Sequence, residues 1–356
     1  MTPPIQTITT SFLRYALLVA VFGVFGSAMA SPKKGICQTT GKDNAKNWKV
    51  KVAAQEGAWH YSWGSQLPEA QVEGVEFVPM IWGYWGASDG FLKEMARLKA
   101  AGEAGEITTL LGFNEPDNRT QANLSVRKAI EAWPHLEATG LRLGSPAGVH
   151  ADNKWMRAFM KEAKAKNLRI DFVTVHWYGG LSVDSLINHL HKIHKLYGKP
   201  IWITEFCPAD WRAKSRNKNY LKPEKVAEFM KEALPRLDAL PFVEKYTWFS
   251  AHPDDRALGP SSLLHRDGTL TELGKVYAAH QASGDAVVIA EAPVYQPVSE
   301  APAPVPSEPQ AEPKTESQSE AKPPIVASEL AEAAPKPKPT IVKPEGPSAV
   351  FLPFEE

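Results

Sequence analysis

Short apolar runs alternate with amphipathic stretches through residues 31–284 of this 356-residue chain. Eight of these runs are rich in aromatic or β-branched residues, as buried strands usually are. They cover residues 34–37, 59–63, 76–82, 108–113, 141–145, 172–177, 201–205 and 245–249. Three of the segments between them repeat apolar residues at the 3.6-residue period of a helix, namely 155–163, 183–197 and 226–237.

Local signals place the ends of two helices. Pro223 suits the first turn of the helix over 226–237, because proline lacks the N–H that a first turn leaves unbonded. An earlier helix has Ser88 or Asp89 as its candidate cap, and Gly102 is predicted to end it.

Alternating strands and helices predict parallel strands joined by right-handed crossovers. Eight such units in about 250 residues predict one α/β domain over residues 31–284, a closed (β/α)8 TIM barrel. No GxGxxG turn follows the first strand, which disfavours a dinucleotide-binding sheet. In a barrel the chemistry lies where the strands end, so the carboxyl ends of the predicted strands are the place to search.

Residues 1–30 have the pattern of a secretory signal peptide. Arg14 precedes the apolar stretch 15–25, and Ala28-Met29-Ala30 forms a small-x-small cleavage site. The alternative is an uncleaved anchor, but the stretch is short for a bilayer, which needs about 20 apolar residues. We expect cleavage before Ser31 and a secreted, periplasmic or extracellular protein with no membrane attachment after cleavage.

Composition changes at about residue 285. Residues 285–356 contain 15 of the 30 prolines, none of the 11 tryptophans, and 12 acidic residues against 5 lysines. Such a segment cannot bury enough apolar surface to offset the entropy lost on ordering. We predict a disordered tail rich in Pro, Glu and Ala.

Charge and cysteine content exclude several classes of protein. The whole chain has 40 basic and 40 acidic residues, with no concentrated basic patch that would indicate a nucleic-acid partner. Cys37 and Cys207 belong to no CxxC or His/Cys cluster, so no structural metal site is expected. These cysteines form a disulfide or remain two buried thiols, and their spacing does not decide between the two.

Two predicted strands end in a glutamate, Glu115 in Asn-Glu-Pro and Glu205 in Ile-Thr-Glu-Phe. Strands four and seven lie roughly opposite each other in an eight-stranded barrel, so their side chains can meet across its mouth. Glycoside hydrolysis needs two carboxyl groups that flank one bond, about 5–5.5 Å apart in retaining enzymes. Strand alternation places the following apolar residues in the interior below the two glutamates: Leu111, Phe113, Ile201 and Ile203.

Polar and aromatic residues at the other strand ends are candidate substrate contacts. Flat aromatic faces pack on the apolar C–H faces of sugar rings, and polar groups there can bond a sugar or a catalytic carboxylate. The candidates are Asn114, His176, Tyr178, Trp248, Trp63 and Trp82, with Trp85 beside the last.

Three motifs together resemble a known family. Gly-Phe-Asn-Glu-Pro-Asp at 112–117, His-Trp-Tyr at 176–178 and Trp-Ile-Thr-Glu-Phe at 202–206 are similar to motifs of the glycosyl hydrolase catalytic core family, or glycoside hydrolase family 128. The segment 263–274 resembles the family's closing segment, and the resemblance covers about residues 33–280.

The resemblance implies a retaining enzyme that acts on β-1,3-glucan. It implies Glu115 as the acid/base and Glu205 as the nucleophile, with Asn114 bonded to the sugar 2-hydroxyl. We also expect a polysaccharide or oligosaccharide substrate, no cofactor or metal, and a monomer.

Other interpretations of the same residues stay open. Each rim glutamate could be salt-bridged, Asn114 could only start a turn, and His176 could only be packed in the rim. As a whole, the protein could be a barrel that binds glycan without cleaving it, or a barrel that carries a working tail. Two N-glycosylation sequons, at Asn118 and Asn123, matter only in a host that glycosylates.

Overall fold

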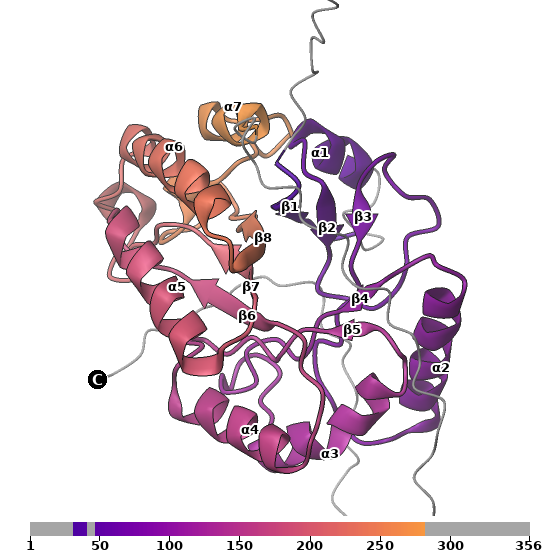
Figure 1. The fold of residues 1–356 in the computed structure, drawn as a ribbon. Helices are drawn as coiled ribbons and strands as arrows, with labels where there is room; N and C mark the ends of the chain where they lie inside the picture. Colours follow the sequence, from indigo (N-terminus) through magenta and orange to yellow (C-terminus); the bar gives the residue numbers. More distant parts are fainter. Residues whose placement is uncertain (1–30, 41–46, 282–356) are drawn as a thin grey trace, which may run out of the picture.

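In the computed structural model, which describes residues 31–40 and 47–281, a ring of helices surrounds parallel strands (Figure 1). The strands are β1 Lys34–Cys37, β2 Trp59–Tyr61, β3 Glu76–Phe77, β4 Thr109–Leu110, β5 Arg142–Leu143, β6 Val173–Trp177, β7 Ile201–Phe206 and β8 Val243–Trp248. All eight lie within or overlap the predicted runs, although β2 to β5 are only two or three residues long. The predicted signal peptide and tail lie outside the described residues.

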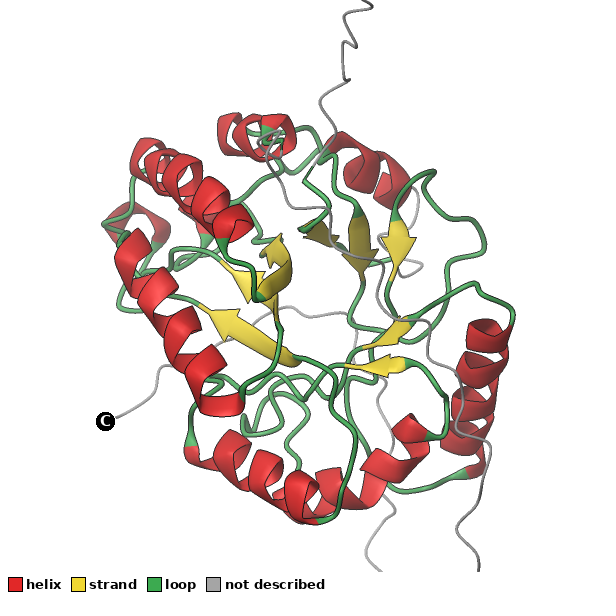
Figure 2. Cartoon of the chain, viewed as in Figure 1, coloured by secondary structure: helices red, strands yellow, loops and turns green. Residues whose placement is uncertain are grey.

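Within the described residues, seven α-helices cover the outside of the strands (Figure 2). They are α1 Trp48–Ala54, α2 Asp89–Glu103, α3 Val126–Glu137, α4 Lys154–Ala165, α5 Val183–Tyr197, α6 Pro223–Ala239 and α7 Glu272–Ala279. The three helices predicted from periodicity are α4, α5 and α6. Residues 62–75 connect β2 to β3 without a helix. None of the described helices is long and apolar enough to cross a membrane.

The ends of α2 and α6 follow from single residues. Ser88 caps α2, because its hydroxyl accepts the N–H of Phe91, and Pro223 begins α6 as predicted. Gly102 does not end α2, which continues to Glu103. The chain turns at Gly105 instead, where a φ of 73° favours a residue without a side chain.

The strands form two parallel sheets with an α/β, barrel-like arrangement. Six strands pair in the order β3-β2-β1-β8-β7-β6, and β4 pairs with β5. Isolated parallel bridges join Met80 to Leu111 and Gly144 to Phe172, so the short sheet lies between the two edges of the long one. All carboxyl ends of the strands therefore point to the same side of the molecule.

A bulge in β7 changes which residues face the interior. Ile203 pairs with Tyr246, whose hydroxyl donates to Asp238 on α6, so Ile203 faces the helices. Trp202 instead contacts Trp59 of β2, three strands away in the sheet. The register then shifts, and His176 pairs with Glu205, which restores Glu205 to the inner face. The prediction that Ile201 and Ile203 fill the interior below Glu205 is therefore wrong.

Opposite charges fill the base of the interior, away from the strand ends that carry the glutamates. Arg142 pairs with Glu244, and its guanidinium lies over the rings of Phe172 and Trp202. Lys245 pairs with Glu76, and its ammonium group lies over the rings of Trp59 and Trp202. Paired charges and aromatic faces therefore satisfy the polar groups of the base.

Both cysteines are buried free thiols. The Cys37 thiol donates to the carbonyl of Trp248, and its sulfur accepts the N–H of Ser250. Burial raises the pKa of Cys37 to about 12 and that of Cys207 well above its ordinary value, so both thiols remain protonated and unreactive.

Candidate active site

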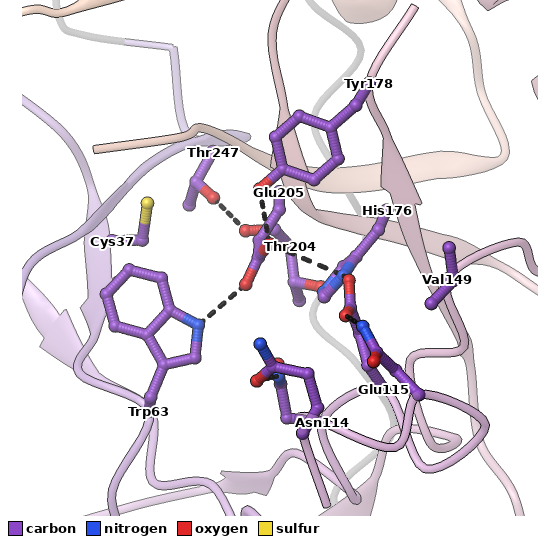
Figure 3. A network of polar contacts seen from close by, with 12 residues as sticks. Cys37, Trp63, Asn114, Glu115, Val149, His176, Tyr178, Thr204, Glu205 and Thr247 are labelled. Carbon is purple, nitrogen blue, oxygen red and sulfur yellow. Dashed lines mark hydrogen bonds and ion pairs between the residues drawn. The ribbon is translucent and has the colours of Figure 1, made fainter. Parts of the chain in front are cut away.

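Glu115 and Glu205 come together at the carboxyl ends of the strands, with His176 between them (Figure 3). One ligand atom from each of the three residues lies within 4.8 Å of the others, and all three side chains are buried. Nδ1 of His176 is 3.2 Å from Oε1 of Glu115 and 3.4 Å from Oε2 of Glu205. The structure thus brings together two carboxyl groups that are 90 residues apart in the sequence.

Glu205 is held by three donors from the ends of two strands, β2 and β6. Its Oε1 accepts from the indole N–H of Trp63 at 2.7 Å and the hydroxyl of Tyr61 at 3.3 Å, while its Oε2 accepts from the hydroxyl of Tyr178 at 2.5 Å. Donors of this kind favour the ionised carboxylate. The carboxylate is therefore fixed in orientation near the end of β7, just after the bulge.

Glu115 lies in a turn beyond β4 and has a left-handed backbone, with a φ of 40°. This conformation is uncommon for a residue with a side chain, and it clusters at functional sites. The N–H of Glu115 donates to the carbonyl of Ala147 at 2.7 Å, which holds the turn against the segment after β5. Its Oε2 accepts from Nδ2 of Asn118 at 2.9 Å.

Burial and mutual charge change the proton affinity of these groups. Burial raises the pKa of Glu205, and the charge of Glu115 raises it further, while His176, Tyr178 and Trp63 oppose the rise. Burial lowers the pKa of His176, but the two carboxylates outweigh that effect and the net shift is upward. Burial, with the charge of Glu205, raises the pKa values of Tyr61 and Tyr178, so both hydroxyls remain donors.

Aromatic rings surround Glu205 in a continuous series. Trp63 packs on Tyr61 and on the edge of Phe249, and Phe249 packs on Tyr178, which contacts Trp211. Trp63 has a left-handed φ of 57°, which directs its indole N–H toward the carboxylate. Trp63 was predicted as a sugar contact, and the structure places it against Glu205.

Asn114 precedes Glu115 and carries an unused acceptor. Its Nδ2 donates to Gln121 at 3.3 Å, while its buried Oδ1 has no partner among the described residues. Buried polar atoms are nearly always bonded, so an unbonded one beside two carboxyl groups suits a ligand hydroxyl.

Trp248 is not a cleft residue, contrary to the prediction. Trp248 lies two positions after Tyr246 on β8, so both side chains point outward, toward the helices. Its ring contacts Phe206 and Phe229, its indole N–H donates to the carbonyl of Ser261, and it is 1% exposed. It packs the layer between the strands and α6.

Phe113 is a second correction. It was expected in the interior below Glu115, but its ring packs against Trp133 of α3 on the outside. Leu111 belongs to the other cluster, with Tyr61 and Trp63. The side chains of Leu111 and Phe113 thus point to different faces, and Gly112 lies between them. A side chain at Gly112 would not fit, because an added Cβ would lie 2.9 Å from the carbonyl of Gly144.

Trp82 and Trp85 form a stacked pair beside the turn that carries Glu115. Their ring centroids are 6.1 Å apart at an interplanar angle of 19°, and Trp85 is 74% exposed. The carbonyl of Trp82 accepts the N–H of Asn114, which fixes the pair relative to the turn that carries Glu115. An added Cβ at Gly83 would come within 2.9 Å of the Trp85 ring, so glycine permits this stack.

Sequence reasoning missed two contacts to the carboxyl groups. Tyr61 bonds Glu205, and alternation along β2 could have placed it beside Trp63. Asn118 bonds Glu115 but had been noticed only as a sequon, because no pattern indicates how a turn folds back. Within the described part of the chain, Glu115, His176 and Glu205 form one group with the spacing of metal ligands.

Comparison with known proteins identifies the class. The sequence profile described as "Glycosyl hydrolase catalytic core" matches residues 35–277, and the chain belongs to this family of glycoside hydrolases. Among curated proteins, Alkali-sensitive linkage protein 1 of Schizosaccharomyces pombe is 33% identical over 179 residues. That match covers 48% of this chain and 32% of the yeast protein, so the chain spans about a third of that relative's length.

Solved structures of glycoside hydrolase family 128 are also similar. An endo-β-1,3-glucanase of Amycolatopsis mediterranei, a mutant in complex with laminaripentaose, is 33% identical with a TM-score of 0.59, covering 70% of this chain and 99% of that one. A curdlan-specific exo-β-1,3-glucanase of Blastomyces gilchristii is 31% identical with a TM-score of 0.54, covering 70% and 99%. An endo-β-1,3-glucanase of Pseudomonas viridiflava is 29% identical with a TM-score of 0.57, covering 72% and 100%.

Proposed function

We propose that this protein hydrolyses β-1,3-glucan with retention of configuration, with Glu205 as nucleophile and Glu115 as acid/base. The observation that carries the proposal is the pair of buried carboxyl groups at the ends of β4 and β7, with oxygens within 4.8 Å of each other. Retaining enzymes need about 5–5.5 Å between carboxyl groups, whereas inverting enzymes need about 6.5–9.5 Å to admit a water. The short separation supports double displacement.

In the first step Glu205 attacks the anomeric carbon, and the bond to the glycosidic oxygen breaks with its electron pair on that oxygen. Glu115 donates its proton to this oxygen, and the leaving chain departs as an alcohol. Tyr61, Trp63 and Tyr178 hold the Glu205 carboxylate in one orientation, so no rotation is needed before attack.

In the second step Glu115, now ionised, accepts a proton from water, and the water oxygen displaces Glu205 from the anomeric carbon. His176 contacts both carboxyl groups and can stabilise the charge that passes from one to the other. The raised pKa of His176 supports this role, because a protonated imidazole balances a carboxylate.

The substrate class is proposed from the relatives and from the exposed tryptophans. The Amycolatopsis enzyme was crystallised with laminaripentaose, and this chain covers nearly all of that structure. Trp82 and Trp85 offer a stacking surface beside the turn that carries Glu115, where a sugar of the bound chain would pack. Asn114 supplies its free Oδ1 to the 2-hydroxyl at the cleavage point.

Three further features belong to the same proposal. The two sheets and their connecting bridges form one closed eight-stranded barrel of the (β/α)8 type, without the helix between β2 and β3. The protein is exported after cleavage before Ser31 and acts as a monomer, with residues 285–356 as a spacer. The signal peptide and the spacer lie outside the described residues.

The second candidate function is glycan binding without cleavage. Digestion of laminarin, curdlan, cellulose and xylan, with reducing ends measured and products separated, distinguishes the two. We expect laminari-oligosaccharides from the β-1,3-glucans and no release from the others. Binding to curdlan without any released sugar would instead favour the second candidate.

A further inference from the structure

Asn118 lies three residues after the proposed acid and folds back onto it. Its backbone N–H donates to the carbonyl of Glu115 at 3.0 Å, which closes a tight turn around Pro116. Its side-chain Nδ2 then donates to Oε2 of Glu115 at 2.9 Å. The turn therefore brings backbone and side chain of one residue against the same glutamate.

The orientation of the Asn118 amide is determined by its other contacts. Its Oδ1 lies 3.1 Å from the backbone N of Thr120 and 2.9 Å from the Thr120 hydroxyl oxygen. A peptide N–H can only donate, so the oxygen of the amide must face Thr120 and the NH₂ must face Glu115. Asn118 is thus a donor, and never an acceptor, toward Oε2.

A donor on Oε2 decides which oxygen of neutral Glu115 carries the proton. The oxygen that accepts from an N–H is the carbonyl-like one, so the acidic proton resides on Oε1. Oε1 lies 3.2 Å from Nδ1 of His176, toward Glu205, and while Glu115 is neutral the Nδ1–H of His176 is donated to the ionised Glu205, whose Oε2 is 3.4 Å away. The proton is then on the side of the carboxyl group where the glycosidic oxygen must be bound.

We propose that Asn118 is a positioning residue that assigns the transferable proton of Glu115 to Oε1. This inference rests on the proposed function for its catalytic meaning, but its effect on the Glu115 proton does not. During cleavage that proton moves from Oε1 to the leaving oxygen, which has received the electrons of the broken bond. Oε2 keeps its hydrogen bond from Asn118 throughout both steps.

The test replaces the donor with an acceptor of the same shape. Asn118→Asp keeps the bonds to Thr120 and sets a second carboxyl oxygen against Oε2, which disfavours ionised Glu115. The pKa of Glu115, followed by ¹³C NMR of labelled glutamate carboxyls, should rise by about one pH unit. The basic limb of kcat/KM should move upward by a similar amount.

A leaving-group series adds a readout that a purely structural role would not move. Asn118→Ala should slow hydrolysis of phenyl laminaribioside about tenfold and leave dinitrophenyl laminaribioside nearly unaffected, because only the poor leaving group needs the proton. Asn123→Asp is the matched control. Asn123 lies in the same segment and is exposed, and its replacement should change nothing.

The outcomes separate the inference from the proposed function. An unchanged Glu115 pKa in Asn118→Asp, with equal losses on both aryl substrates in Asn118→Ala, overturns the inference. A raised Glu115 pKa in Asn118→Asp, in a protein whose wild type cleaves no β-1,3-glucan, supports the inference and rejects the function.

Discussion

His60 and His176 are buried to the same degree, 0% and 1% exposed, yet their proton affinities change in opposite directions. His60 faces outward from β2 between the rings of Trp48 and Phe77, and neither ring nitrogen has a partner among the described residues. Burial lowers the pKa of His60 to about 4. The pKa of His176 is raised, because Glu205 and Glu115 outweigh the same effect of burial.

The difference shows that burial of a histidine alone does not indicate a functional role. An imidazole among aromatic rings stays neutral and serves as packing. An imidazole between two carboxylates holds a proton where negative charge must be moved and balanced. Variants that remove either environment should therefore change different properties of the molecule.

The largest effect, a loss of kcat, is expected when either carboxylate next to His176 is removed. Glu205→Gln should lower kcat about 10⁴-fold or more, and Glu115→Gln about 10²- to 10⁴-fold on unactivated glucan. Either change removes one negative partner, so the pKa of His176 should fall toward that of His60. Reducing-end assays and ¹⁵N NMR of the imidazoles measure the two effects.

Glu244→Gln is the control for these variants, since Glu244 is a partly buried carboxylate at the base of the barrel-like interior. It should leave kcat and the His176 titration unchanged. Normal turnover in both rim variants would place the reaction elsewhere.

The next effect concerns His60 and stability. Between pH 6.5 and about 4 the unfolded chain binds a proton at this histidine and the folded protein does not, so the folded state loses stability as pH falls through that window. His60→Phe removes the loss. The free energy of unfolding of His60→Phe minus that of the wild type should therefore increase by roughly 3 kcal/mol as the pH is lowered from 7 to 4.

Urea unfolding at several pH values measures this difference. His252→Asn is the control, because its side chain is mostly exposed and the variant should follow the wild type. A constant difference between His60→Phe and wild type across the range would show that His60 binds its proton at the same pH in the folded and unfolded protein.

A smaller effect is expected at Trp63, which donates a hydrogen bond to Glu205, one of the two carboxylates that raise the pKa of His176. Trp63→Phe keeps the ring packing and removes the 2.7 Å donor to Oε1. A hydrogen bond to a charged group contributes about 1.5–3 kcal/mol, so kcat/KM should fall roughly 10- to 100-fold. The pKa of Glu205 should rise further, which moves the acid limb of the pH profile upward.

Trp155→Phe is the matched control for that experiment, because the indole N–H of Trp155 donates to the backbone carbonyl of Leu124 rather than to a carboxylate. Its pH profile should match the wild type. An acid limb that stays in place in Trp63→Phe would mean that the indole does not stabilise ionised Glu205.

The sequence was sufficient for the strands, for four of the seven described helices and for the two glutamates, because these rest on strong local patterns. Periodicity located α4, α5 and α6, and all eight strands fall in the predicted runs. Glu115 and Glu205 were expected to meet because the ends of parallel strands lie at one edge, and they do. Tyr178 and His176 followed from the same alternation.

The directions of several other side chains could not be read from alternation. A register shift in β7 reverses the faces of Ile203 and Glu205, and a two-residue β4 ends before Phe113 and Glu115. Trp248 looked like a cleft residue because tryptophan suits both sugar binding and packing. Left-handed turns at Trp63 and Glu115 leave no signal in the sequence, since neither is glycine.

The division of labour between Glu205 and Glu115 is the central claim, and azide rescue tests it most directly. In Glu205→Ala, azide can enter where the nucleophile stood, and an activated β-laminaribioside should give the α-glycosyl azide, with inverted configuration. In Glu115→Ala, Glu205 still forms the glycosyl enzyme, and azide should give the β-glycosyl azide, with retained configuration. NMR of the products identifies each anomer. Exchanged anomers would reverse the assignment, and undiminished glucan hydrolysis without azide in both variants would contradict it.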